Sequence, residues 1–324
     1  MVVTLQRQMN YWDDEVQHMI SFSIIIPTYN EEADIRRTCE SLVNLEYPKK
    51  EIILVDGGST DNTVRIISEF AEKYGFKLLY QPIRGVGAPR NMGIREATGD
   101  VVVILNADVF PRPDFLRHIL EHYIRGADAV AVDSEIVNTQ EVFGRYAHAL
   151  HLLFFGGDKP VGWTEGFSCK RKAAIEAGLF PEEIPVPCGE DVVFYNRLKK
   201  VVPRQVLDKT IVVPHVAPGD LRTYWRQQLT RGWGVPYINY SIYKKPLFYV
   251  IARVVLGTGL TLAELLLVFP NLIRAIRLSA LSPNGYRDFF AFWGIDVLRL
   301  IAGRLGHWRG LVDLFGKLNL EQEE

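Results

Sequence analysis

Cysteine is scarce in this sequence, and its placement excludes two classes of protein. The 324 residues include three cysteines, Cys39, Cys169 and Cys188, which are separated by long intervals. Such spacing provides neither a framework of disulfides nor a Cys-x-x-Cys metal motif. We therefore expect a protein of a reducing compartment.

An excess of positive charge and a secretory signal are also missing. Lys and Arg total 37 against 38 for Asp and Glu, so the net charge is −1. A chain with this balance is not predicted to bind nucleic acid. Residues 1–20 lack the apolar core of a signal peptide and are interpreted as an N-terminal extension, of which residues 11–20 could form a short helix with one apolar side.

What the first half does contain is a regular alternation of apolar runs and amphipathic segments. Strands are predicted at residues 22–26, 51–55, 76–80 and 101–105, and helices at 31–45, 61–74 and 89–97. This alternation is typical of an α/β fold with a mostly parallel sheet flanked by helices. Further on, helices are predicted at 114–125 and 191–200, strands at 129–132 and 205–213, and irregular structure across 156–188.

One long apolar run, residues 247–269, contains only two charged side chains, Arg253 and Glu264. Its length suffices to span a bilayer, whereas the amphipathic stretch at 289–301 is too short. The run is predicted to associate with a membrane, by spanning it or lying on it. The alternative is a helical hairpin packed on the rest of the protein or in a dimer interface.

These observations predict three regions. Residues 1–20 form the extension, residues 21–235 an α/β domain, and residues 236–324 a C-terminal helical appendage associated with a membrane. Since 324 residues exceed what one core usually fills, a large domain with an appendage is the expected layout.

Polar loops follow three of the predicted strands. Pro27, Tyr29 and Glu31 lie in the first loop, Asp56 begins the second, and Asn106-Ala107-Asp108 forms the third. Open α/β sheets bind ligands at the carboxyl ends of their strands. A carboxylate there can hold Mg²⁺ or Mn²⁺, which in turn binds phosphates. The loops therefore predict a nucleotide-diphosphate site in which Asp108 is a metal ligand.

Other side chains are candidates for the same site. Asp56 could accept a hydrogen bond from a base or a ribose, and Arg90 could face the nucleotide. His215 follows the last predicted strand, from which it could reach the metal. Glu190 and Asp191 begin a helix, where a carboxylate either caps the helix or serves as a general base.

The segment 228–233 offers a cation and an indole. Arg231 could bind the leaving phosphate, and Trp233 could stack on a sugar. The alternative is that this segment is a helix that packs on the domain.

Taken in order, these motifs resemble those of the family-2 glycosyltransferases, which are inverting enzymes of the GT-A fold. The resemblance covers residues 21–235 and includes the two nucleotide loops, Arg90-Asn91-x-Gly93, Asn106-Ala107-Asp108, Gly166-Phe167 through Gly178-Leu179-Phe180, and Glu190-Asp191. Three positions depart from the family pattern: Gly57 and Asn106 stand where many members have Asp, and Gly232 separates Arg231 from Trp233.

The resemblance implies an enzyme that transfers one sugar, with inversion, from a UDP- or GDP-linked donor. Asp191, paired with Glu190, would be the base, and Mn²⁺ or Mg²⁺ would be the cofactor. The acceptor would be a glycan or a polyprenyl-linked lipid at the cytoplasmic face of the cell membrane. The residues expected to bind the nucleotide-sugar are Pro27, Tyr29, Glu31, Asp56, Arg90, Asn106, Arg231 and Trp233, and those expected to bind the metal are Asp108 and His215.

Two other functions are compatible with an α/β fold of this kind. A sugar nucleotidyltransferase would need a glycine-rich loop directly after the first strand, and residues 27–32 contain no glycine. A catalytically inactive nucleotide-binding or scaffold protein is favoured by Asn106 and disfavoured by Asp108 and Asp191.

Overall fold

The computed structural model describes residues 20–82, 85–155 and 164–323, so the predicted short helix at 11–20 lies almost wholly outside the described residues. The chain divides into two compact units. Unit 1 comprises Met1–Glu135, Lys159–Phe180 and Asp191–His215, and unit 2 comprises Ile136–Asp158, Pro181–Glu190 and Val216–Glu324.

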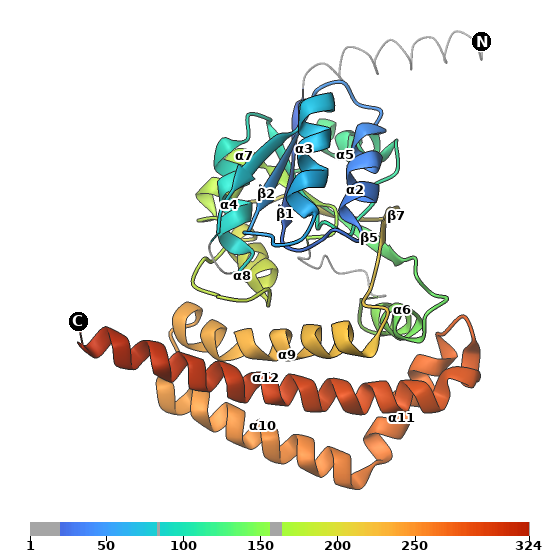
Figure 1. Cartoon of the computed structure of the whole chain (residues 1–324), viewed down its shortest axis with the longest axis vertical. Helices are drawn as coiled ribbons and strands as arrows, with labels where there is room; N and C mark the ends of the chain where they lie inside the picture. Colours follow the sequence, from blue (N-terminus) through green and yellow to red (C-terminus); the bar gives the residue numbers. More distant parts are fainter. Residues whose placement is uncertain (1–19, 83–84, 156–163, 324) are drawn as a thin grey trace. The chain divides into compact units, whose positions relative to one another are not determined.

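Unit 1, whose sheet is partly labelled in Figure 1, is built on seven strands in the order β3-β2-β1-β4-β6-β5-β7. Strand β1 (Phe22–Thr28) lies parallel to both β2 (Lys50–Asp56) and β4 (Val101–Ile104), and β3 (Lys77–Tyr80) continues the parallel half. Strand β6 (Phe167–Lys170) is antiparallel to β4 and to β5 (Ala129–Ile136). The predicted α/β class with a mostly parallel sheet is confirmed.

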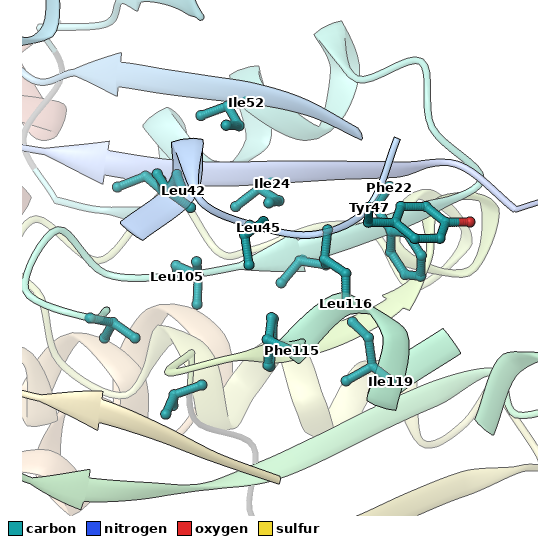
Figure 2. Packing of buried hydrophobic residues seen from close by; sticks show 14 of the residues in the cluster. Phe22, Ile24, Leu42, Leu45, Tyr47, Ile52, Leu105, Phe115, Leu116 and Ile119 are labelled. Carbon is teal, nitrogen blue, oxygen red and sulfur yellow. The ribbon is translucent and has the colours of Figure 1, made fainter. Parts of the chain in front are cut away.

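Helices cover both faces of this sheet. Along β1, Ile24 and Ile26 point to the face covered by α2 (Ile35–Val43), α3 (Thr63–Tyr74) and α5 (Phe115–Ile124). Ile25 points to the face of α4 (Gly87–Glu96), α7 (Arg171–Glu176) and α8 (Glu190–Leu198). Figure 2 shows the first of these cores, in which Ile24 and Ile52 of the sheet lie near Leu42 and Leu116 of the helices. Strands buried on both faces read as continuous apolar runs, which is why the sequence located them.

The predicted elements of the first half agree with the structure to within a few residues. Gly75 ends α3 with a φ of 73°, a left-handed conformation that glycine adopts without strain. The loop-rich prediction for 156–188 missed β6 and α7, and α6 (Val142–Phe155) had no predicted counterpart. Short elements of four to six residues give too little periodicity to be distinguished from loops.

Unit 2 is helical. It contains α6, α9 (Leu221–Tyr237), the short η1 (Ile238–Ile242), α10 (Leu247–Leu267), α11 (Phe269–Ala280), η2 (Gly285–Asp288) and α12 (Phe289–Glu323). Helix α12 contacts α9, α10 and α11, and Figure 1 shows it running alongside α9 and α10. The stretch predicted as a short amphipathic segment at 289–301 is therefore the start of a 35-residue helix.

Charged side chains form a buried network inside unit 2. Asp296 is fully buried and accepts hydrogen bonds from Arg274 Nε at 2.6 Å, Arg299 Nε at 2.9 Å and the Tyr146 hydroxyl at 2.8 Å. Arg274 also forms an ion pair with Glu264. Because each buried charge has a partner, helices α6, α10, α11 and α12 are tied together through polar contacts.

Helix α10 is the one described helix that is long and apolar enough to cross a membrane, a test that some core helices of soluble proteins also pass. Its bounds lie inside the predicted apolar run at 247–269. The predicted domain boundary at residue 235 falls within α9, which belongs as a whole to unit 2.

Candidate functional site

The loops after β1, β2 and β4 leave the same edge of the sheet, because the three strands are parallel neighbours. At the end of β2, Asp56 is 1% exposed and both of its carboxylate oxygens accept hydrogen bonds within its own loop. Oδ2 accepts from the backbone N–H groups of Gly58 and Ser59 at 2.9 and 3.0 Å, and Oδ1 accepts from the Ser59 hydroxyl at 2.5 Å. Asp56 therefore fixes the shape of the second loop, and its predicted contact with a nucleotide stays a prediction.

The first loop is held against the second by Asn30, which sequence reasoning did not single out. Asn30 adopts a left-handed φ of 54°, which Asn tolerates better than most residues. Its Oδ1 accepts from the Thr60 N–H at 2.8 Å, and its own N–H donates to the Ser59 hydroxyl at 2.9 Å. Pro27 is buried at the end of β1, whereas Tyr29 is 60% exposed, so its ring is accessible for stacking.

Asp108 and His215, the two predicted metal ligands, lie side by side. The end of β7 (Gln205–His215) forms an antiparallel bridge between His215 and Val109, supported by a bond from the Phe110 N–H to the Pro214 carbonyl at 2.9 Å. This bridge brings His215 Nε2 to 3.1 Å from Asp108 Oδ2. Glu165 lies nearby, with Oε1 at 3.9 Å from His215 Nε2.

This pair fits a divalent cation in its chemistry. Asp108 Oδ1 is shielded from solvent and has no hydrogen-bond partner among the described residues, which is unfavourable for a carboxylate oxygen. Carboxylate oxygen and imidazole nitrogen are both ligands of divalent metals. The described residues form no ready cluster of three or more His, Cys, Asp or Glu side chains, so a bound ion would complete its coordination with water or ligand oxygens.

Glu31 lies among other carboxylates close to Asp108. Burial, together with repulsion from Asp108, Asp34 and Asp61, raises the pKa of Glu31 from 4.5 to about 8. Burial and Asp108 also raise the pKa of Asp34. With this pKa Glu31 is mostly protonated at neutral pH, and a divalent cation bound at Asp108 would favour its ionised form.

Arg90, Asn106 and Thr164 form a hydrogen-bonded group beside this cluster. Arg90 is 3% exposed, and its Nη2 donates to Asn106 Oδ1 at 3.0 Å and to Thr164 Oγ1 at 2.9 Å. Thr164 Oγ1 in turn lies 3.3 Å from Asn106 Oδ1. The amide oxygen of Asn106 is used in this way, which leaves the NH₂ group as its hydrogen-bond donor. Asn106 is thus suited to donate to a donor-sugar oxygen and not to bind a metal.

The rest of the Arg90-Asn91-x-Gly93 motif is structural. Asn91 is buried and exchanges two hydrogen bonds with the backbone of Phe180, each at 2.9 Å. A Cβ atom on Gly93 would lie 2.4 Å from Ile25 Cγ2, so glycine is required where α4 crosses β1. The motif therefore holds Arg90 in place through the packing of its neighbours.

Glu190 and Asp191 begin α8 and straddle the division between the units, Glu190 in unit 2 and Asp191 in unit 1. Glu190 is 6% exposed, whereas Asp191 is half-buried and its Oδ1 accepts from the Val192 N–H at 2.7 Å. The first turn of a helix favours a negative charge, so this position suits a carboxylate. Asp191 is the more exposed of the two, and its predicted role as a base stays a prediction.

Arg231 and Trp233 lie on α9 in unit 2. The indole N–H of Trp233 donates to Asp313 Oδ2 at 3.2 Å, and the Arg309 guanidinium lies 4.1 Å from the centroid of its ring. Gly232, which interrupts the family pattern, has a packing role: a Cβ there would lie 2.1 Å from the Gly303 carbonyl oxygen of α12. Arg231 is exposed, and the sugar-binding roles of both residues stay predictions.

Comparison with known families identifies the sheet-bearing part of the chain. Residues 23–182 match the model of glycosyl transferase family 2. These residues belong to that family, so the resemblance drawn from the motifs is confirmed. The family match ends before Asp191 and His215.

Curated relatives are similar to the chain over part of this region, which is also only part of their own length. A probable glycosyltransferase of Bacillus subtilis, YdaM, is 37% identical over 116 residues, which cover 34% of this chain and 28% of that protein. A Methanococcus voltae dolichyl N-acetyl-alpha-D-glucosaminyl phosphate 3-beta-D-2,3-diacetamido-2,3-dideoxy-beta-D-glucuronosyltransferase is 41% identical over 108 residues, or 32% of this chain and 34% of that protein. The chain thus matches about a third of the length of either relative.

Solved structures resemble the chain over most of its length. The mannosyltransferase PcManGT of Pyrobaculum calidifontis, solved with GDP-Man and Mn²⁺, has a TM-score of 0.58 at 20% identity, covering 93% of this chain and 94% of that one. Staphylococcus aureus TarS 1–349 with UDP-GlcNAc has a TM-score of 0.52 at 17% identity, covering 89% and 90%. At these identities the likeness establishes the GT-A fold alone.

Proposed function

We propose that this protein is an inverting glycosyltransferase that moves one sugar from a nucleotide-diphosphate donor to an acceptor hydroxyl or phosphate. The observation that carries this proposal is the Asp108–His215 pair, at 3.1 Å, beside the edge of a family-2 domain where ligands bind. A carboxylate oxygen without a partner among the described residues supports a cation there.

Asp108 and His215 would hold Mn²⁺ or Mg²⁺, which would neutralise charge on the departing diphosphate. Mn²⁺ is the better candidate, because Mg²⁺ prefers ligands that are all oxygen. A bound cation would in turn relieve the repulsion that raises the pKa of Glu31 and of Asp34. PcManGT, whose fold this chain shares, was solved with Mn²⁺.

The chain's own side chains would carry the remaining steps. Tyr29 would stack on the base, and the Asn106 amide, oriented by Arg90, would donate to the donor sugar or ribose. Asp191 would take the proton of the acceptor hydroxyl as the acceptor oxygen forms a bond to the anomeric carbon. The bond from that carbon to the diphosphate oxygen breaks at the same time, so the nucleoside diphosphate leaves and the configuration inverts.

The acceptor is proposed to be a lipid-linked sugar or phosphate at the cytoplasmic face of the cell membrane. Two observations support this proposal: the exposed apolar helix α10, and the name of the Methanococcus relative, which describes a dolichyl phosphate-linked acceptor.

The first test is thermal unfolding of the purified chain with UDP, GDP and other nucleoside diphosphates, each with and without Mn²⁺ or Mg²⁺. A ligand that binds the folded state raises the midpoint. We expect a shift with one nucleotide that requires the metal and disappears in Asp108→Asn. A folded protein that shows no shift with any nucleotide would instead be an inactive scaffold.

Asp191→Asn separates catalysis from binding. Loss of a general base is expected to lower kcat by about 10²- to 10⁴-fold while the metal-dependent thermal shift is retained. The matched control is Asp208→Asn, because Asp208 is a carboxylate of the same unit that is paired with His122 at 2.8 Å. Unchanged turnover in Asp191→Asn would refute its assignment as the base.

A further inference from the structure

Helices α10 and α11 expose an apolar face that lacks a partner among the described residues. We name it the α10–α11 face and define it by Phe248, Leu256, Leu260, Leu266, Phe269 and Ile276. Leu266 is 83% exposed, Phe248 73% and Leu260 72%. Soluble monomers rarely expose a contiguous apolar area of this kind, so it marks a binding surface.

The opposite side of α10 is fastened to α12. Val250 and Val254 pack with Leu311, and the Trp308 indole donates to Thr258 Oγ1 at 3.0 Å. Arg304 Nε donates to Thr261 Oγ1 at 3.1 Å. Helix α10 is therefore not free to move alone, and its position in any membrane determines that of α12.

Helix α12 is too highly charged to accompany α10 across a bilayer. Besides Asp296 and Arg299, it carries Arg304, Arg309 and Asp313, and it runs alongside α10 (Figure 1). Placing these side chains at the depth of the hydrocarbon core would cost about 3 kcal/mol or more for each unpaired charge. An α10 that lies in the plane of the membrane avoids this cost, because α12 then stays on the water side.

The exposed charged side chains between residues 240 and 300, the segment that includes the α10–α11 face, are all basic. Between residues 240 and 300 the acidic side chains are Glu264, Asp288 and Asp296, and each forms an ion pair with an arginine. None of them is exposed. The exposed charged side chains of this segment are Lys244, Lys245, Arg253, Arg277 and Arg287.

We infer that the α10–α11 face inserts in the plane of an anionic membrane surface, with both ends of α10 on the same side of the bilayer. Apolar side chains enter the headgroup boundary, and the basic side chains contact anionic lipid. This surface is separate from the site around Asp108, and the inference does not depend on the transfer reaction.

The first test is flotation of the full chain with vesicles of phosphatidylcholine alone or mixed with phosphatidylglycerol. We expect binding to the mixed vesicles at least about tenfold tighter than to the neutral ones, and weaker in high salt. The double variant Leu256→Glu/Leu260→Glu should lose binding. The matched control is Ile124→Glu, since Ile124 is 49% exposed on α5 of unit 1, and it should bind like the parent.

Two outcomes would overturn the inference. One is equal binding of the double variant and the parent. The other is a parent chain that does not bind vesicles and sediments as a dimer, together with a double variant that sediments as a monomer. In that case a second copy of the chain covers the α10–α11 face. Circular dichroism and the metal-dependent nucleotide shift of the double variant would verify that it is folded.

A second test distinguishes a helix in the plane from one that spans. Lys245→Cys precedes α10 and Asn284→Cys follows α11, and both parent residues are exposed. Each variant, with Cys188 replaced by Ser, is treated with a membrane-impermeant maleimide in inside-out and right-side-out vesicles from expressing cells. Labelling of both positions from the same side supports the inference, and labelling from opposite sides overturns it.

Discussion

In unit 1 the apolar side chains of β1, β2 and β4 are buried on both faces of the sheet, whereas in unit 2 helices α10 and α11 expose theirs. Charge is distributed in the reverse way. Unit 1 keeps several ion pairs at its surface, such as Arg117–Glu46, and unit 2 buries Asp296 between two arginines. Unit 1 thus follows the pattern of a protein surrounded by water, and the proposed membrane contact would account for the reversed pattern of unit 2.

Removing the central charge of unit 2 should give the largest effect on stability. Asp296→Ala leaves Arg274 and Arg299 without their buried partner, and breaking a buried pair in this way costs about 3–5 kcal/mol. Urea unfolding measures the loss, and hydrogen exchange should rise across α6 and α11.

The control for this prediction is Glu121→Ala, which removes an exposed ion pair with Arg125 in unit 1 and should cost less than about 0.5 kcal/mol. Equal losses in the two variants would remove the contrast between the units.

A half-buried carboxylate of unit 1, Glu51, should make the stability of the protein fall at acid pH. Burial raises the pKa of Glu51, but hydrogen bonds from Lys77, Ser23 and Thr98 outweigh it and lower the pKa to about 2. Because the folded pKa is depressed, the stabilisation is complete above about pH 4.5 and is lost as the pH falls towards 2.

Glu51→Gln should therefore lower the free energy of unfolding by roughly 2 kcal/mol at pH 7. Between pH 4.5 and 2 the variant should lose less stability than the parent does. Urea midpoints measured across this range provide the test. Glu46→Gln, which alters an exposed carboxylate, should show the same dependence of stability on pH as the parent. The same dependence in Glu51→Gln would contradict the role given to Glu51.

Two glycine-to-alanine substitutions, Gly93→Ala in unit 1 and Gly294→Ala in unit 2, should change stability in opposite directions. In unit 1, Gly93→Ala places a Cβ 2.4 Å from Ile25 Cγ2 in a filled core, and overpacking of this kind costs about 1–3 kcal/mol. Thermal unfolding should show a lower midpoint.

In unit 2, Gly294→Ala on α12 meets no atom within 4 Å. Alanine is the better helix former, so the substitution should stabilise the protein by about 0.5–1 kcal/mol. The same measurement on both variants compares the packing at these two positions. A loss of stability for Gly294→Ala would indicate that a partner covers this position.

The first half of the fold could be predicted because its signals are local. Short runs of consecutive residues define the apolar strands, the helix end at Gly75 and the polar loops after β1, β2 and β4. The sequence did not predict β6 and α7, because elements this short show no clear periodicity. The amphipathic segment predicted at 289–301 is shorter than α12, because charged residues interrupt the apolar pattern of α12. Thr164 and Glu165 carry no motif, so their place beside Asn106 and His215 could not be foreseen.

The α/β class, the family match of residues 23–182 and the apolar character of α10 follow from the order of neighbouring residues alone. The packing of the folded chain, in contrast, places His215 against Asp108, directs the Asn106 oxygen to Arg90 and brings Gly232 against α12. Arg90 and Asn106 are 16 positions apart, and Asp108 and His215 are 107 apart. Gly232 brings the backbones of α9 and α12 together. Such contacts depend on how strands and helices pack in space, and no pattern of adjacent residues encodes them.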